Sequence, residues 1–222
     1  MVPARPFLRR LIELIHPNLK PHHFIRLTQE AKEDLAIWEI FLKQYNGKTF
    51  FRTLHMTSTT LHMASDSSHI GFGACFTSHW IQSQFPQSWS KYHITFLEMY
   101  PVFVIISMFG KRITNSHVLF LTDNSAVKDI INSQTSKNKD VMKIVRPLIL
   151  TLIKYNIQLT SQHIPGSSNI LPDAISRFQV TQEMLNSRGM DPQPTPVPQH
   201  LLPENFEEWY TMMSSVPYLT MH

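Results

Sequence analysis

The chain has 222 residues, of which 42% are hydrophobic and 11% aromatic, enough for one globular core with appendages. A single cysteine, Cys75, excludes an internal disulfide framework, and no apolar run approaches the roughly 18 residues of a membrane span or forms a signal peptide. We therefore expect an intracellular protein, in the cytoplasm or nucleus, that is not secreted and has no membrane partner. The whole chain has a net charge of +4, and its basic excess lies in residues 1–178, which hold 19 basic and 11 acidic side chains. A basic body of this kind favours a polyanionic partner.

The first part of the chain has the pattern of two amphipathic helices. Phe7–His16 is closed by Pro17, and Thr28–Tyr45 repeats apolar residues at three- and four-residue spacing before Asn46-Gly47. We expect residues 1–57 to form a helical segment that docks on the core of the protein.

A β-hairpin follows, over Leu61–Ala74, with Asp66 at the tip of its first strand. We expect the second and third strands at Gly71–Ser78 and Gln87–His93. The next segment, His93–Lys111, is a mostly apolar helix that carries Glu98 in its early turns, with an irregularity expected at Pro101.

The second half of this region alternates strands and helices. It begins with a buried strand, His117–Thr122, which is followed by Asp123-Asn124. Two helices follow, Ser125–Asn132 and Asp140–Tyr155, and then an alternating strand, Ile157–Ile164. A short last helix, Ile170–Arg177, bears Asp173. The order β-β-β-α-β-α-α-β-α predicts an α/β domain over residues 58–179, with a mixed sheet flanked by helices. Six prolines follow Phe178, so we expect residues 180–222 to be an extended, Pro-rich flexible tail.

The acids of residues 61–178 are few and specifically placed. Only six carboxylates occur there, and four of them, Asp66, Glu98, Asp123 and Asp173, lie at element ends or in an early helical turn. If the first and fourth strands are parallel neighbours, Asp66 and Asp123 leave the same edge of the sheet. Carboxylates gathered there repel one another unless a cation lies between them, and oxygen ligands favour Mg²⁺ or Mn²⁺. Two such ions form an arrangement that cleaves phosphodiesters.

These residues also form a familiar series of motifs. They are Ser65-Asp66-Ser67-Ser68 with Gly71-Phe72-Gly73-Ala74, Phe96-Leu97-Glu98, Leu121-Thr122-Asp123-Asn124-Ser125, and His163-Ile164-Pro165-Gly166 with Asn169 and Pro172-Asp173-Ala174-Ile175-Ser176-Arg177. In this order the region resembles the ribonuclease H domain of retrotransposon reverse transcriptases, and it is most similar to that of DIRS-type elements. The resemblance implies a ribonuclease H-like, five-stranded mixed sheet. Residues 1–57 resemble, more loosely, the segment that joins the polymerase thumb to this domain.

The resemblance also implies a function. Asp66, Glu98, Asp123 and Asp173 would be the catalytic residues and the ligands of two Mg²⁺ ions, with Mn²⁺ as a substitute and Asp66 bridging the ions. The implied substrate is an RNA/DNA hybrid cut on its RNA strand, with Ser67, Ser68 and Asn124 as candidate contacts to 2′-hydroxyl groups. The chain has no Tyr-X-Asp-Asp polymerase motif. We therefore expect a piece of a larger polyprotein, with the polymerase domain as its partner.

Some readings remain open at this point. Taken singly, Asp66 and Asp123 fit turn residues, and Glu98 fits a solvated helix acid. Family members often have Thr-Asp-Ala-Ser around the first acid and alanine before the last, where this chain has Ser65-Asp66-Ser67-Ser68 and Pro172-Asp173. The alternative function is a catalytically silent or domesticated nucleic-acid-binding remnant. A transposase or integrase of the same fold is disfavoured, because its glutamate comes third rather than second.

Overall fold

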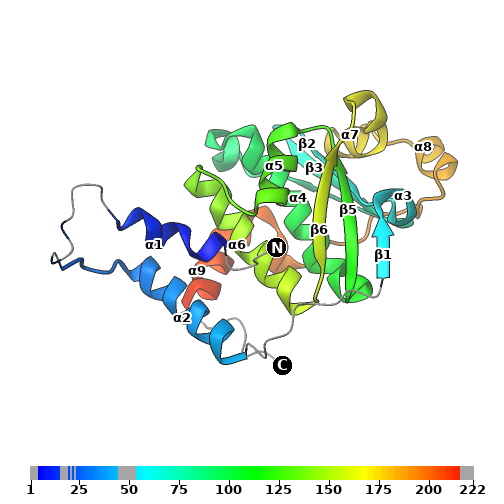
Figure 1. The fold of residues 1–222 in the computed structure, drawn as a ribbon. Coiled ribbons are helices and arrows are strands. Elements are labelled where there is room, and N and C mark those ends of the chain that lie inside the picture. The colour runs from blue at the N-terminus through cyan, green and yellow to red at the C-terminus, as the bar shows by residue number, and fades with distance from the viewer. Residues whose placement is uncertain (1–4, 16–19, 21, 23, 45–53, 216–222) are drawn as a thin grey trace.

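The computed structural model describes residues 5–15, 20, 22, 24–44 and 54–215. Strands β2 (Ala64–Ser67), β3 (Gly71–Phe76) and β4 (His79–Gln84) form an antiparallel meander, while β5 (Ser116–Thr122) runs parallel to β2 and β6 (Gln158–His163) runs parallel to β5. The first and fourth strands of the predicted order are therefore adjacent and parallel, as expected. The predicted α/β fold, a mixed sheet flanked by helices, is confirmed (Figure 1).

A sixth strand, β1 (Leu54–Thr57), was not predicted. It pairs in parallel with β5 over Leu54–Thr57 and Ser116–Leu119, and the short helix α3 (Ser58–Leu61) separates it from β2. Since β6 occupies the other edge of β5 along the same residues, β1 and β2 share one edge. The sheet thus has five strand positions, one of them filled by two successive strands.

The predicted third strand is wrong. The chain reverses at Thr77-Ser78, with Thr77 in the left-handed region at φ 55°, and β4 follows at once. Residues Gln87–Lys91 instead form the 3₁₀ helix η2, in which Trp89 turns into the core at 5% exposure. Strand β4 was hard to recognise because its second half, Gln82–Gln84, is polar.

Four longer or site-forming helices complete the domain: α4 (Ile94–Phe109), α5 (Ser125–Ser133), α6 (Lys139–Lys154) and α7 (Ile170–Ser176). Pro101 and Pro147 lie inside α4 and α6, and both helices are continuous through them. Because neighbouring residues of a strand point to opposite faces, the contacts of Ser67 with α4 and of Asp66 with α7 place these two helices on opposite faces of the sheet.

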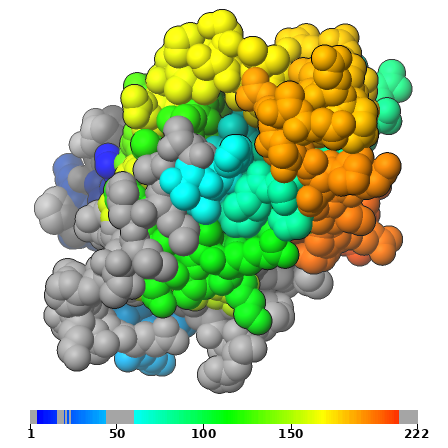
Figure 2. Space-filling view, turned by 90° about the vertical axis from the view of Figure 1, so that its right-hand side faces the viewer, coloured from blue at the N-terminus to red at the C-terminus, as the bar shows by residue number. Residues whose placement is uncertain are grey.

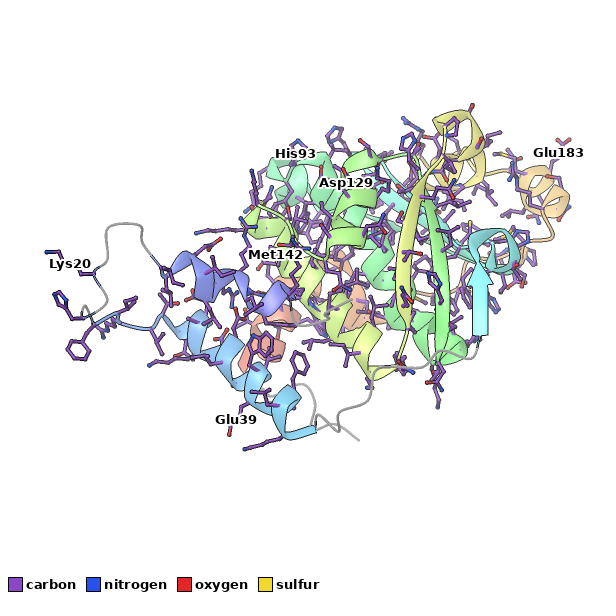
Figure 3. The ribbon with its side chains drawn as sticks, in the orientation of Figure 1. Lys20, Glu39, His93, Asp129, Met142 and Glu183 are labelled. Carbon is purple, nitrogen blue, oxygen red and sulfur yellow. The ribbon has the colours of Figure 1, made fainter. Side chains whose placement is uncertain are left out.

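The core lies between the sheet and helices α4 and α6, where side chains fill the space (Figure 3). Helix α4 is buried on nearly all sides, which explains its continuous apolar sequence. The stretch Ile94–Ile113, which is α4 with the 3₁₀ helix η3 (Gly110–Ile113), is long and apolar enough to cross a membrane by length and composition, but 72% of its apolar 18-residue window is buried inside the fold. It is the central core helix.

The segment after Phe178 is folded in the part that the structure describes, so the expected flexible tail is wrong for residues 180–215. It contains α8 (Gln182–Ser187), two 3₁₀ helices, η5 (Gln199–Leu201) and η6 (Pro203–Asn205), and α9 (Phe206–Ser215). Phe206 and Trp209 are 1% and 7% exposed and join the main core. Between α8 and η5, the amides of Asp191 and Thr195 donate to the carbonyls of Ser78 and Trp80 at 2.8 and 2.7 Å. This strap, residues 190–196, covers the free edge of β4.

The N-terminal segment also docks on the core. It contains the 3₁₀ helix η1 (Arg5–Phe7), α1 (Arg9–Glu13) and α2 (Gln29–Gln44), which correspond to the two predicted helices. Phe7 is 1% exposed within the main core. Arg146 of α6 donates to Asp34 Oδ2 of α2 at 2.7 Å, and both side chains are buried. Such a pair is costly to break from one side, so it fixes how α2 sits on α6.

Candidate active site

Asp66 and Asp123 emerge side by side from parallel strands. Ala64 of β2 pairs with Leu121 of β5, and each acid lies two residues further along its strand direction. Asp66 is 6% exposed, whereas Asp123 is half-buried. The predicted meeting of these two residues at one sheet edge follows from the register.

Glu98 is held beside Asp66 by the attachment of α4 to β2. His93 caps this helix, with its Nδ1 accepting from the amide of Thr95 at 3.2 Å. The hydroxyl of Ser67, the residue after Asp66, donates to the carbonyl oxygen of Leu97 at 2.8 Å. Glu98, the next residue of the helix, is 7% exposed. It is therefore a buried acid rather than a solvated one.

Helix α7 reaches the site because Gly73 lets it approach β3 closely. Gly73 is the cross-strand partner of Asp66. A Cβ atom placed on it would lie 2.5 Å from Cγ2 of Ile175 and 2.8 Å from the amide nitrogen of Ser176. Gln82 adds a hydrogen bond from its Nε2 to the carbonyl of Ile175 at 2.5 Å. Only glycine fits here, because any side chain would push α7 away from Asp66.

Ser176 is a site residue to which the sequence analysis gave no role. Its hydroxyl oxygen lies 2.6 Å from Oδ2 of Asp66, and the residue is fully buried. The sequence signal was its place three residues after Asp173, on the same face of a short helix as that acid. That spacing puts Asp173 and Ser176 on one side of α7 but does not tell which strand they face.

Asn169 links the two strands that carry Asp66 and Asp123. Its Nδ2 atom donates to the carbonyl of Ser65 at 3.2 Å and to Oδ1 of Asp123 at 3.4 Å. The residue is 1% exposed, and its own Oδ1 has no hydrogen-bond partner in the structure. A buried amide oxygen without a partner is unusual and marks a place where water or an ion completes the site.

The electrostatics show that the four acids act on one another. Burial, and then the charges of Asp66, Asp123 and Asp173, raise the pKa of Glu98 to about 9. Burial and the charges of Asp123 and Asp173 raise the pKa of Asp66 to about 6, against the lowering effects of the Ser176 hydrogen bond and of Arg177. Two carboxyl groups thus bind protons unusually tightly, as expected where several acids share little counter-charge.

Asp173 takes a different position from the other three. Its Oδ1 accepts from Nε of Arg177 at 2.7 Å, and the two side chains are 45% and 52% exposed. Among the residues that the structure describes, no three His, Cys, Asp or Glu side chains are arranged to hold one metal ion. The four predicted ligands are therefore electrostatically coupled, but they do not form a closed coordination shell here.

The three residues predicted to contact the RNA strand, Ser67, Ser68 and Asn124, differ in how free their side chains are. Ser67 is buried and its hydroxyl is directed to α4, so its geometry makes it a residue that holds α4 rather than one that meets a ligand. The Ser68 hydroxyl donates to the carbonyl of Ser176 at 2.9 Å. The Asn124 side-chain oxygen caps α5, accepting from the amides of Ala126 and Val127 at 3.0 and 3.2 Å. The Nδ2 group of Asn124 forms no hydrogen bond with the described part of the chain.

The fold and this sheet edge define a mixed α/β domain in which Asp66 and Asp123 lie at the carboxyl ends of two parallel strands, with Glu98 on α4 and Asp173 on α7. No protein-family model matches the chain. It is 21% identical to an enzymatic polyprotein of Cassava vein mosaic virus over an alignment of 190 residues, which covers 78% of this chain and 29% of that polyprotein. Among solved structures it is similar to RNase H1 from the halophilic archaeon Halobacterium salinarum NRC-1. That likeness has a TM-score of 0.41 and 11% identity, and it covers 56% of this chain and 95% of that one.

Proposed function

We propose that this chain is a ribonuclease H domain that cleaves the RNA strand of RNA/DNA hybrids, within a larger reverse transcriptase polyprotein of retrotransposon type. The observation that carries the proposal is the pair of buried acids, Asp66 and Glu98, which lie beside Asp123 and Asp173 and whose pKa values are raised by burial first and then by the charges of those two acids. Buried carboxylates that repel one another cost stability and persist where they have a function. The similarity to a viral enzymatic polyprotein supports the larger context, and a polymerase domain of the same polyprotein is the partner we propose. DIRS-type origin remains part of this proposal.

The donor set fits two hard divalent ions. All four acids offer oxygen atoms, the ligands that Mg²⁺ and Mn²⁺ prefer, and the unpartnered Oδ1 of Asn169 adds an oxygen beside Asp123. Asp66, Glu98, Asp123 and Asp173 would hold the ions. When bound, the ions supply an activated hydroxide and stabilise the leaving 3′-oxygen and the phosphate charge.

The residues of the chain prepare the site for this chemistry. Ser176 fixes the orientation of Asp66, and the Ser67–Leu97 hydrogen bond fixes α4 and with it Glu98. The ion pair of Asp173 with Arg177 is exposed and therefore weak. The Asp173 carboxylate joins the other acids when it turns away from Arg177. Of the three residues predicted to contact the RNA strand, Asn124 at the start of α5 is the best placed, because its Nδ2 group can donate to a nucleic acid bound at this edge of the sheet.

A catalytically silent, nucleic-acid-binding remnant is the second candidate. It is favoured by the position of Asp173, which is paired with Arg177, and by the absence of a closed ligand shell among the described residues. In that case the excess of basic side chains in residues 1–178 binds nucleic acid, and the four acids hold no metal ion. The two candidates make opposite predictions for cleavage.

A cleavage assay distinguishes them. Purified protein is incubated with a hybrid labelled on the RNA strand, in Mg²⁺ or in Mn²⁺, and the products are resolved by length. We expect cleavage that leaves 5′-phosphate ends and that Asp66→Asn and Asp123→Asn abolish without changing the circular dichroism spectrum. Binding without cleavage in either metal establishes the remnant and refutes the enzyme.

A further inference from the structure

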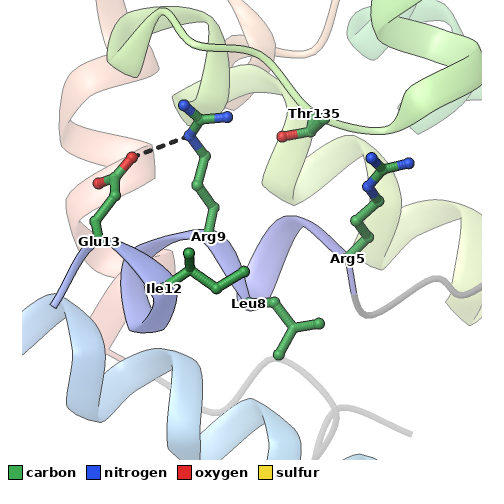
Figure 4. A pocket seen from close by; sticks show the side chains of 6 residues that line it. All are labelled: Arg5, Leu8, Arg9, Ile12, Glu13 and Thr135. Carbon is green, nitrogen blue, oxygen red and sulfur yellow. Dashed lines mark hydrogen bonds and ion pairs between the residues drawn. The ribbon is translucent and has the colours of Figure 1, made fainter. Parts of the chain in front are cut away.

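A groove lies away from the four acids, between the N-terminal segment and the loop that joins α5 to α6. It has a volume of about 350 Å³ and is lined by Arg5, Leu8, Arg9, Ile12, Glu13 and Thr135. Figure 4 shows the guanidinium groups of Arg5 and Arg9 extending to the same side, with the Thr135 side chain between them. Segments about 125 residues apart in the sequence thus build one opening.

The groove carries positive charge that the protein itself does not neutralise. Arg5 forms no ion pair within the described part of the chain. Arg9 pairs with Glu13 at 3.0 Å, but the two side chains are 33% and 47% exposed, and such pairs contribute little. The same loop carries the exposed side chain of Lys137, and that of Lys139 is exposed at the start of α6. By contrast, the neighbouring Arg10 is directed to the acids of α2, Glu33 and Asp34.

Both walls of the groove are firmly anchored. Next to Arg5, Pro6 and Phe7 are buried, and the Pro6 and Phe7 carbonyls accept from Nη2 of Arg146 at 3.4 Å and from Nε1 of Trp38 at 3.3 Å. Before Thr135, Gln134 is 4% exposed and ends α5 in the left-handed region at φ 57°. The two arginines are therefore presented by fixed backbone, which lowers the entropy lost when they bind a ligand.

We propose that Arg5, Arg9 and Thr135 bind the phosphodiester backbone of the nucleic acid that occupies the active site. Two guanidinium groups and a hydroxyl are donors suited to phosphate oxygens, and the exposed Leu8 and Ile12 suit the apolar faces of the sugars. This inference rests on the proposed function. Helix α5 begins beside Asp123 and ends at this loop after 9 residues, about 14 Å at 1.5 Å per residue. That span is about four nucleotides at 3.4 Å each.

The test measures binding separately from cleavage. Fluorescence anisotropy of the full chain in EDTA gives dissociation constants for a labelled hybrid, for wild type and for the double variant Arg5→Ala and Arg9→Ala. We expect the double variant to bind about tenfold more weakly, with the slope of log K against log salt reduced by about two. The matched control removes two positive charges elsewhere, by Lys43→Ala and Lys154→Ala, and we expect it to bind like wild type.

Hybrids of different length locate the contact. In a hybrid that ends within about three base pairs of the cut on both sides, the double variant should bind like wild type, because the duplex does not reach the groove. Two longer hybrids are then compared, each extended by ten base pairs on a different side of the cut. The tenfold difference between wild type and the double variant should return with only one of them. Equal loss in both double variants, or no dependence on hybrid length, overturns the proposal.

Two further outcomes separate this inference from its alternatives. If a labelled oligo-aspartate peptide loses as much affinity in the double variant as the hybrid does, the groove is a general anion site and the nucleic-acid assignment fails. If the hybrid binds as predicted but wild type never cleaves it in Mg²⁺ or Mn²⁺, the groove assignment stands and the proposed nuclease activity fails.

Discussion

The hydroxyl oxygen of Ser176 lies 2.6 Å from Oδ2 of Asp66 and 2.9 Å from the carbonyl oxygen of Asp173. One hydroxyl hydrogen serves only one acceptor at a time, and an ionised carboxylate is the stronger acceptor. Ser176 therefore donates to Asp66 when that acid is charged. Helix α7 thus contributes the group that orients Asp66, besides contributing Asp173.

Replacement of Ser176 by alanine should impair cleavage through Asp66. Loss of a hydrogen bond to the charged form raises the pKa of Asp66 further above its usual range, so the acidic limb of the pH–rate profile moves to higher pH. We expect the maximal rate to fall about tenfold, as for a bond to a charged group worth about 1.5–3 kcal/mol. Ser187→Ala, which removes an exposed hydroxyl that donates to Met184, is the control. An unshifted pH profile in Ser176→Ala would refute this role.

Glu98 should destabilise the metal-free protein as the pH rises. Its pKa is about 9 in the folded chain and about 4.5 when unfolded, so between these values the folded state binds a proton that the unfolded state has released. Stability therefore falls across that window. At pH 7 the cost is on the order of 3 kcal/mol, and Glu98→Gln should recover much of it in urea denaturation with EDTA. The exposed Glu183→Gln serves as the control, and equal stability of Glu98→Gln and wild type at pH 5 and pH 8 would contradict the prediction.

Divalent ions should stabilise the protein more in alkaline than in acidic solution. Below pH 6 both Asp66 and Glu98 carry protons, which a metal ion must displace in order to bind. At pH 8 Asp66 has lost its proton, so that fewer protons have to be displaced. At an ion concentration of 100 times Kd we expect about 2.7 kcal/mol of stabilisation, seen as a rise in melting temperature of several degrees at pH 8 and a smaller rise at pH 5.5. Asp123→Asn should remove most of this rise. A metal effect independent of pH would argue against these ligands.

The C-terminal segment should be required for stability. Phe206→Ala removes a side chain that is 1% exposed within an aromatic cluster, and such truncations cost about 3–5 kcal/mol. Deletion of all residues after Phe178 should cost more. Phe24→Ala, at a fully exposed phenylalanine, should change stability by less than about 0.5 kcal/mol. Unfolding curves of the three variants and of wild type decide the matter, and an unchanged midpoint in Phe206→Ala would show that α9 does not hold the core.

Local patterns predicted the elements that carry Asp66, Glu98 and Asp123. Asp123 follows an apolar strand, Glu98 lies in an apolar helix, and Asp66 precedes a turn and the two glycines of the next strand. The adjacency of Asp66 and Asp123 then followed from two parallel strands. Ser176 was not predicted, since its contact depends on the approach of α7 over Gly73, which is a long-range feature of packing. The ion pair of Asp173 with Arg177 has readable spacing, but the sequence does not show whether Arg177 or the other acids attract that carboxylate.

The C-terminal segment shows how composition can mislead. Alternating prolines between Pro192 and Pro198 indicate an irregular tail, but two amides of the strap, those of Asp191 and Thr195, donate to the carbonyls of Ser78 and Trp80 and hold it against β4. The signal that was available is the spacing of Phe206, Trp209 and Tyr210, which puts three aromatic rings on one helix face. Two of these rings, those of Phe206 and Trp209, complete the core.

The strap also has a bearing on self-association. An uncovered edge strand presents a row of unpaired amide and carbonyl groups to other chains. In this protein residues 190–196 lie along the start of β4, where their amides bind the carbonyls of Ser78 and Trp80. Removal of the segment would leave β4 open to pair with the same strand of a second copy. A shortened chain should therefore scatter light and aggregate at concentrations where the intact chain stays monodisperse.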